Sequence, residues 1–229
     1  MNSLNMSINV ISSPVEAFNA LKEKPHFWLP LIIIPLAFAA YQLVYFNFVD
    51  YGWLLEQMAL QAQEKGGNPD QVEAMKNIPK MLMMIPGIIM GTVFIIFVQT
   101  IYATYLMLVS KGTGDNFSFK AMFSLTLWCG LPAVFTMLAC IINMLITDSG
   151  RVFFDAVNPF SLNSLIFDVG LASPFRGIVT QIDLFMLWSW VLITIAYKQF
   201  SKRSYGHAAL VALAPYVLVY GIWILVAAM

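Results

Sequence analysis

The stretch MLMMIPGIIMGTVFIIFVQTIYATYLMLV, residues Met81–Val109, contains no charged side chain. A helix needs about 20 apolar residues to cross a hydrocarbon core of about 30 Å, so this stretch is long enough to span a membrane. Four further segments meet the same requirement: Phe27–Val49, Phe119–Ile146, Ile178–Tyr197 and His207–Ala228. Because backbone polar groups in lipid must be satisfied within their own segment, each span is expected to be a helix.

The composition of the whole chain agrees with a membrane location. Its 229 residues are 60% hydrophobic and only 10% charged, with a mean hydropathy of +0.77. A soluble domain is about half apolar and about a quarter charged. We therefore predict an all-α membrane protein with five transmembrane helices, in which residues 1–26 form a cytoplasmic segment and residues 27–229 form one five-span domain. The formal net charge of zero gives no argument for binding nucleic acid.

Basic residues in the connections set the expected orientation. With five spans, the connections on the N-terminal side carry seven basic and three acidic residues, and those on the other side carry five and eight. Since cytoplasmic loops are enriched in Lys and Arg, the N-terminus is expected in the cytoplasm and the C-terminus outside. The expected contacts with anionic headgroups on the cytoplasmic side are made by Lys22, Lys24, Lys198, Lys202 and Arg203.

A short helix is expected before the first span. Ser13, Pro14 and Glu16 have the spacing of a capping box with proline at the first helical position. The following residues are amphipathic, so this helix would either lie on the cytoplasmic surface or pack against the spans.

The two long external connections are also expected to contain structure. Residues 50–80 hold helix formers that are interrupted by Gly66-Gly67 and restarted by Asn68-Pro69, which predicts a helical hairpin. Residues 147–177 contain NPFSLNSLIF, which is too short to cross the membrane and too apolar for a solvated loop. We expect this segment to be interfacial or re-entrant.

One carboxylate, Asp183, falls inside an expected span. It follows Ile178 by five residues, which corresponds to about 8 Å along a helix from the outer end. An acidic side chain at the centre of a membrane helix costs about 2.5–3.5 kcal/mol, so polar partners are expected nearby. The residues predicted at the outer ends of neighbouring segments, and thus assigned with Asp183 to a polar site, are Asn47, Lys80, Asn143 and Arg176.

Two roles are open for Asp183. It could bind a cation or solute, or take part in a proton step, because acids within membranes often mark such sites. It could instead pair with Lys80 or Arg176, or lie near a helix N-terminus, where the helix dipole stabilises negative charge.

The remaining patterns indicate packing more than chemistry. Gly87 and Gly91 form a GxxxG pair that allows close helix approach, either within the chain or at a dimer interface. HExxH, GxSxG, P-loop and dinucleotide-binding patterns are absent from the sequence. We therefore predict a protein that is not an enzyme and that has no catalytic residues, cofactor or bound metal.

Several stretches together resemble the Yip domain family, named for Ypt/Rab-interacting proteins, in its bacterial branch. They are SPVEAFNALKEKP, FVDYGW, LEQM, TGDNFSFKAMFSL, NPFSLNSL and DLFMLWSWVLITIAYKQFSKRSYGHAA, in that order along nearly the whole chain. The resemblance implies a five-helix domain in the bacterial inner membrane, with the bilayer and either a second copy or another membrane protein as partners. A Rab-type GTPase partner is not expected, because the long N-terminal region of the eukaryotic relatives, with its DLYGP-type motif, is missing here.

Two functional hypotheses follow. The first is a non-enzymatic membrane protein that organises membrane or docks protein or lipid partners, as the resemblance implies. The second is a small transporter, channel or lipid-handling protein with a polar site around Asp183. The first predicts a well-packed bundle with Asp183 paired or capped, whereas the second predicts a cavity that reaches Asp183 and is lined by Asn47 and Asn143.

Overall fold

The fold is built from helices, as the sequence predicts. The computed structural model describes residues 3–64 and 66–229, and all regular elements within these ranges are helical. The α-helices are α1 (Ser3–Ser12), α2 (Pro14–Glu23), α3 (Trp28–Phe48), α4 (Tyr51–Glu64), α5 (Pro69–Met75), α6 (Lys80–Gly112), α7 (Phe119–Cys129), α8 (Ala133–Ile146), α9 (Arg176–Gln181), α10 (Leu184–Ser201) and α11 (Tyr205–Ala227). Two single turns, η1 (Phe154–Ala156) and η2 (Asn163–Phe167), lie in the connection between α8 and α9.

Four segments of the described chain are long and apolar enough to cross a membrane: α3, α6, α7 with α8, and α11. They correspond to four of the five predicted spans and make this a multi-pass membrane protein. The prediction of one continuous helix over Ile178–Tyr197 is wrong, because α9 ends at Gln181 and α10 begins at Leu184. The physical reason is Asp183, whose side chain caps the first turn of α10 and so favours a helix start over a helix interior.

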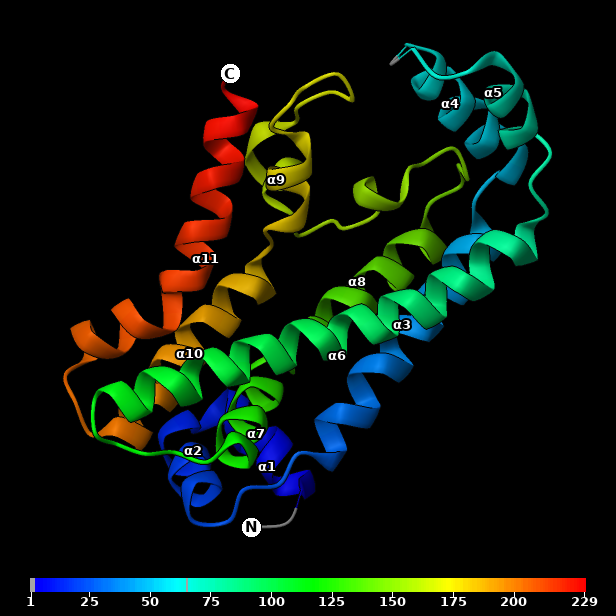
Figure 1. The fold of residues 1–229 in the computed structure, drawn as a ribbon. Helices are drawn as coiled ribbons and strands as arrows, with labels where there is room; N and C mark the ends of the chain where they lie inside the picture. Colours follow the sequence, from blue (N-terminus) through cyan, green and yellow to red (C-terminus); the bar gives the residue numbers. More distant parts are fainter. Residues whose placement is uncertain (1–2, 65) are drawn as a thin grey trace.

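The helices form an elongated bundle whose connections gather at two ends (Figure 1). α3 packs against both α6 and α8, and α10 packs among α2, α7, α8 and α11. The N-terminal helices α1 and α2 lie at one end, and α4, α5, α9 and the end of α11 lie at the other. The connections therefore gather at two opposite ends of the bundle, as predicted from the sequence. Which of these ends faces the cytoplasm stays a prediction.

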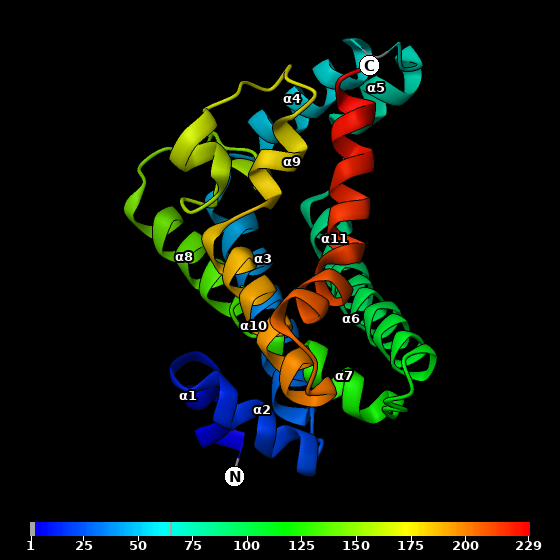
Figure 2. The same ribbon diagram turned by 90° about the vertical axis from the view of Figure 1, so that its left-hand side faces the viewer.

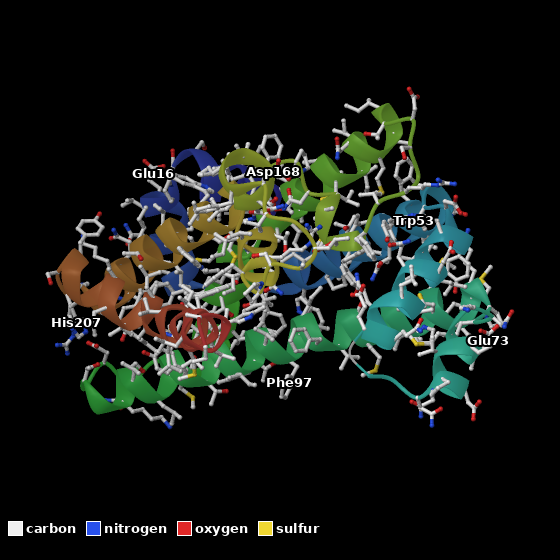
Figure 3. All side chains as sticks on the ribbon, turned by 90° about the horizontal axis from the view of Figure 1, so that it is seen from above. Glu16, Trp53, Glu73, Phe97, Asp168 and His207 are labelled. Carbon is white, nitrogen blue, oxygen red and sulfur yellow. The ribbon has the colours of Figure 1, made fainter. Side chains whose placement is uncertain are left out.

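The interior contains two hydrophobic clusters. One joins the N-terminal helices to α7 and α10, and residues Ala121 to Cys129 of α7 are all buried there. The second joins α3 to α8 and to the loop that follows α8. In contrast, α6 buries few residues, and Phe97 points away from the bundle with 57% of its surface exposed (Figure 3). Exposed apolar side chains of this kind are expected to face lipid.

α11 is bent (Figure 2), and two tyrosine side chains of α6 donate hydrogen bonds to its backbone at the bend. Pro215 has no amide hydrogen to donate to the carbonyl of Val211, so a carbonyl of the preceding turn loses its helical donor. The hydroxyl of Tyr105 donates to the Val211 oxygen at 3.0 Å, and that of Tyr102 donates to the Ala212 oxygen at 2.6 Å. The polar backbone at the bend is thus satisfied within the protein, as a lipid environment requires.

The predicted short helix before the first span is α2, and it packs against α7 and α10 with Phe18 and Leu21 fully buried. The capping box is not formed, because Ser13 makes no side-chain cap. The backbone amide of Ser13 instead donates to the backbone carbonyl of Asn9 in α1. The helix α1 was not predicted, and it leads directly into α2.

The predicted pair of helices in residues 50–80 is present as α4 and α5. Asn68 caps α5 by accepting a hydrogen bond from the Asp70 amide at 2.9 Å. Gly66 has φ +76°, a left-handed conformation that glycine adopts without strain. Lys65, which directly precedes Gly66-Gly67 in the predicted hairpin, lies outside the described residues.

Candidate functional site

Asp183 lies at the break between α9 and α10 and is surrounded by neutral hydrogen-bond donors. Its Oδ1 accepts a hydrogen bond from the Met186 amide at 2.7 Å, which caps α10. Its Oδ2 accepts from the Thr136 hydroxyl on α8 at 2.8 Å and from the Asn158 amide at 2.8 Å. Only 4% of the residue is exposed. Within the described residues, no Lys or Arg side chain forms an ion pair with this carboxylate.

The backbone at the break is paired with the connection that follows α8. Ile182 and Asp183 are extended, and Ser161 and Asp183 form an isolated antiparallel bridge. The Leu162 amide donates to the Ile182 oxygen at 2.8 Å, and the Leu184 amide donates to the Phe160 oxygen at 3.3 Å. The segment NPFSLNSL therefore folds against the break, and its hydrogen bonds replace those that a continuous helix would have made.

Asn158 is oriented by a second hydrogen bond of its own. Its Oδ1 accepts from the Phe160 amide at 3.0 Å, which leaves its Nδ2 directed at Asp183. A side-chain oxygen that accepts from the amide two residues ahead is typical of asparagine in turns. The Asn-Pro turn thus positions a donor for the carboxylate.

The depth of Asp183 differs from the value of about 8 Å that a continuous helix would give. Thr136, its hydrogen-bond partner, precedes the end of α8 at Ile146 by ten residues, or about 15 Å of helix. The carboxylate is therefore closer to the middle of the Phe119–Ile146 span than to its end.

Two cavities adjoin the break. The first, here called the α6-side cavity, has a volume of about 350 Å³ and lies among α3, α6, α8, α10 and α11. Its polar lining residues are Gln99, Thr136, Gln181, Asp183, Ser189 and Tyr216. The second, the loop-side cavity, has a volume of about 300 Å³ and shares Thr136, Met137 and Gln181 with the first. Neither Asn47 nor Asn143 lines either cavity, in contrast to the arrangement expected for a transport site.

Two amide side chains of the α6-side cavity lack partners. Neither Gln99, halfway along α6, nor Gln181, at the end of α9, forms a side-chain hydrogen bond with another described residue. Gly130 provides space for the first of them, because a Cβ atom at this position would stand 3.0 Å from Nε2 of Gln99. Gln99 is half-exposed and Gln181 is exposed, so both side-chain amides are accessible to a ligand in this cavity.

The other residues assigned to the polar site do not gather around Asp183. Arg176 binds Asp155, with 2.8 Å between its Nε and a carboxylate oxygen, and also donates to the Val169 carbonyl. Lys80 donates to Asn47 at 3.5 Å. Asn143 donates to the Val157 carbonyl at 2.9 Å. They brace the connections at the end of α3, the start of α6 and the end of α8.

The predicted headgroup contacts divide into two kinds. The Lys22 ammonium donates to the Phe200 carbonyl at 2.6 Å and thus caps the end of α10. Burial and, second, the charge of Lys202 lower the pKa of Lys22. Arg203 donates hydrogen bonds to the Asp115 carboxylate at 3.3 Å and to the Thr113 carbonyl. The Lys198 ammonium lies 5.1 Å from the centre of the Tyr205 ring. Lys24 and Lys202 are exposed.

The glycine pair in α6 faces α3 of the same chain. A Cβ atom at Gly91 would collide with the Phe38 ring, and one at Gly87 would stand 3.8 Å from Gln42. These two glycines therefore allow α6 to approach α3 closely within the same chain.

Residues 3–64 and 66–229 contain no group of three His, Cys, Asp or Glu side chains that could hold a metal ion.

Asn158 and Thr136 were not predicted as site residues. The Asn-Pro pair was visible in the sequence, but only as a helix start, and a threonine in an apolar helix carries no signal of its own.

The comparisons with known proteins agree with this architecture. The membrane protein YknW of Bacillus subtilis (strain 168) is 28% identical over 187 residues, which cover 81% of this chain and 74% of that protein. No solved structure matches the chain. The family model of the Yip1 domain matches residues 8–227. Since this match spans nearly all of the sequence, the chain belongs to the Yip1 domain family.

Proposed function

We propose that this protein is a non-enzymatic, five-span protein of the bacterial inner membrane that binds a lipid, or another amphiphile, with its polar head at Asp183. The observation that carries the proposal is the α6-side cavity, which combines a carboxylate, two unpaired amides and apolar walls. The N-terminus is cytoplasmic and the C-terminus is outside in this proposal. α10 is then the fourth of the five spans in chain order, and it packs against α2, α7, α8 and α11.

The broken helix supports a binding role. Interrupted helices with polar backbone at membrane depth are tolerated only where they are buried in protein or line a cavity, and transporters place substrates at such breaks. Here the break between α9 and α10 is both paired with the NPFSLNSL segment and adjacent to two cavities.

The chemistry of the cavity favours an ammonium head. Asp183 accepts hydrogen bonds from neutral donors, and no cationic side chain of residues 3–64 and 66–229 pairs with it. A ligand with a positively charged group would therefore form a charge-assisted hydrogen bond with this carboxylate. The amide oxygens of Gln99 and Gln181 can accept further hydrogen bonds from such a head. Phosphatidylethanolamine, with a primary ammonium and two acyl chains, matches these requirements.

The walls and size of the cavity suit the apolar part of such a ligand. Apart from the polar residues, it is lined by side chains such as Phe94, Val98 and Met186. Its volume of about 350 Å³ lies within the range of about 300–1,000 Å³ for small-molecule pockets. The outer face of α6 is apolar and exposed, so the acyl chains would extend from the cavity into the bilayer.

Native mass spectrometry of the protein released from nanodiscs tests the proposal. Nanodiscs would contain phosphatidylethanolamine together with phosphatidylglycerol, and the wild type would be compared with Gln99→Leu and with Gln71→Leu, a control on the exposed face of α5. We expect wild type and control to retain phosphatidylethanolamine, and Gln99→Leu to retain about 2- to 10-fold less, since one hydrogen bond contributes about 0.5–1.5 kcal/mol. Equal retention by all three proteins, or none by the wild type, would refute the proposal.

A second candidate function is the organisation of membrane or the docking of a partner. Lys24 and Lys202 favour it, because both are exposed at the end of the molecule where α2 packs on α10. Cross-linking in native membranes tests this alternative. A defined partner or oligomer that is cross-linked equally to the wild type and to Asp183→Asn would support this function. If neither protein is cross-linked to a partner or to a second copy, the result would count against it.

A further inference from the structure

The N-terminal helix α1 has three distinct faces. Its ten residues, SLNMSINVIS, include no charged side chain. Met6 and Val10 are fully buried against the rest of the protein. Leu4, Ile8 and Ile11 form a separate stripe, and 69%, 59% and 38% of their respective surfaces are exposed. At 100° per residue this apolar stripe lies roughly 100° from the polar face that carries Asn5 and Asn9.

Two of the three serines of α1, Ser7 and Ser12, form hydrogen bonds within their own helix. The Ser7 hydroxyl donates to the Ser3 carbonyl at 3.1 Å, and the Ser12 hydroxyl donates to the Ile8 carbonyl at 3.0 Å. Serines that bond back to their own helix in this way are compatible with an apolar environment. The apolar stripe is therefore flanked by hydroxyls that are already satisfied.

A groove lies between the exposed face of α1 and the neighbouring parts of α3 and α8. It has a volume of about 410 Å³ and is lined mainly by apolar side chains: Ile8 and Ile11 of α1, Ile33 of α3, and Leu131, Val134 and Phe135 around the start of α8. Figure 2 shows α1 below the lower end of α8 and beside α2. The apolar surface continues from the groove along the exposed faces of α3 and α8, where Ile32, Leu36 and Leu138 point outward.

We propose that α1 is embedded in the lipid leaflet on the N-terminal side and that an acyl chain of a bilayer lipid fills this groove. The groove is continuous with the faces by which α3 and α8 contact lipid, so lipid reaches it without leaving the bilayer. Residues 3–15 carry no charged side chain, and the first charged side chain in the sequence is that of Glu16 in α2. An uncharged helix with an exposed apolar face and a separate polar face is suited to the boundary between headgroups and acyl chains.

This inference changes the predicted organisation of the N-terminal segment and does not depend on the site at Asp183. Instead of one cytoplasmic segment over residues 1–26, α1 lies in the leaflet and α2 lies on its surface. α2 carries Glu16, Lys22 and Glu23, which favour the headgroup region and water. The two helices thus form a hairpin that enters one leaflet and returns.

Fluorescence quenching in proteoliposomes tests this placement. A bimane probe would be attached to Ile8→Cys, and to Glu16→Cys as the matched position on α2. The wild type, whose Cys129 and Cys140 are buried, measures background labelling. One set of vesicles would contain phosphatidylcholine brominated in the middle of its acyl chains, and a second set would receive iodide in the aqueous phase.

We expect the probe at position 8 to be quenched at least twofold more by brominated lipid than the probe at position 16, and iodide to give the reverse order. Efficient iodide quenching at position 8 would place α1 in water and overturn the proposal. Quenching by neither agent would mean that protein, such as a second copy, covers this face, and it would overturn the proposal as well. If Ile8→Cys does not fold, Leu4→Cys reports on the same stripe.

Discussion

The hydrogen bond from Thr136 to Asp183 gives the sharpest stability prediction. Thr136→Val removes the hydroxyl and keeps the side-chain volume, so the carboxylate loses one of its three donors without the creation of a cavity. A hydrogen bond to a charged group contributes about 1.5–3 kcal/mol. Since hydrogen bonds between membrane helices reach at most about 1.7 kcal/mol in double-mutant cycles, we expect a loss near the lower limit, about 1.5 kcal/mol. For a chain of this size such a loss lowers the Tm by roughly 3–6 °C.

The control for this substitution lies at the end of the same helix. The Thr147 hydroxyl is exposed and donates to the Asn143 carbonyl at 2.7 Å, so Thr147→Val removes a hydroxyl that holds no other segment in place. Thermal unfolding of the three proteins in nanodiscs would measure the difference. In an Asp183→Asn background the cost of Thr136→Val should fall, because the two residues act on one interaction. If Thr136→Val lowers the Tm no more than Thr147→Val, the assigned role of the hydroxyl is wrong.

Three further substitutions probe other parts of the structure. Gly130→Ala should displace the side-chain amide of Gln99 and reduce the retention of phosphatidylethanolamine severalfold, while the protein stays folded. Unchanged retention in native mass spectrometry would contradict the assigned cavity geometry. Tyr105→Phe should cost about 1 kcal/mol in chemical unfolding, because the Val211 carbonyl at the bend of α11 loses its donor, and a cost below about 0.3 kcal/mol would argue against this function of the hydroxyl. Lys22→Met should cost about 1 kcal/mol through loss of the cap on α10, whereas Lys24→Met, which removes an exposed ammonium, should stay within about 0.5 kcal/mol; equal costs would refute the cap.

The apolar spans could be predicted from the sequence because they are local features. Phe27–Val49, Met81–Val109 and His207–Ala228 agree with α3, α6 and α11 to within a few residues at most ends. Uninterrupted apolar length is sufficient information for a helix that faces lipid on one side. The paired helices α4 and α5 were predictable for a similar reason, because Asn68 and Pro69 are local start signals.

The break at Asp183 could not be predicted in this way because its causes are distant in the chain. Apolar residues continue on both sides of Asp183, and only its contacts with Asn158 and Thr136, which lie 25 and 47 positions away, show that it is a helix start. The same limit explains Arg176, whose position two turns before Asp183 suggested a pair. Because the helix of Arg176 ends before Asp183, the two side chains do not lie on one helix face, and the Arg176 guanidinium binds Asp155 instead.

The N-terminal segment shows a second limit of local patterns. Ser13 and Glu16 have the spacing of a capping box, yet Ser13 follows α1 without an intervening loop, and its amide is already bonded to Asn9. α1 itself is uncharged and only ten residues long, so neither its length nor its charge pattern distinguished it from a loop.

The occupancy of the α6-side cavity is the most direct test of the proposed binding site. An experimental structure of the protein in nanodiscs that contain phosphatidylethanolamine would show it. The proposal predicts density for a lipid head within hydrogen-bond distance of Asp183 and of at least one of Gln99 and Gln181, with its chains leaving along α6. A cavity closed by movement of α6, with the Gln99 amide bonded to another side chain of the protein, would contradict it.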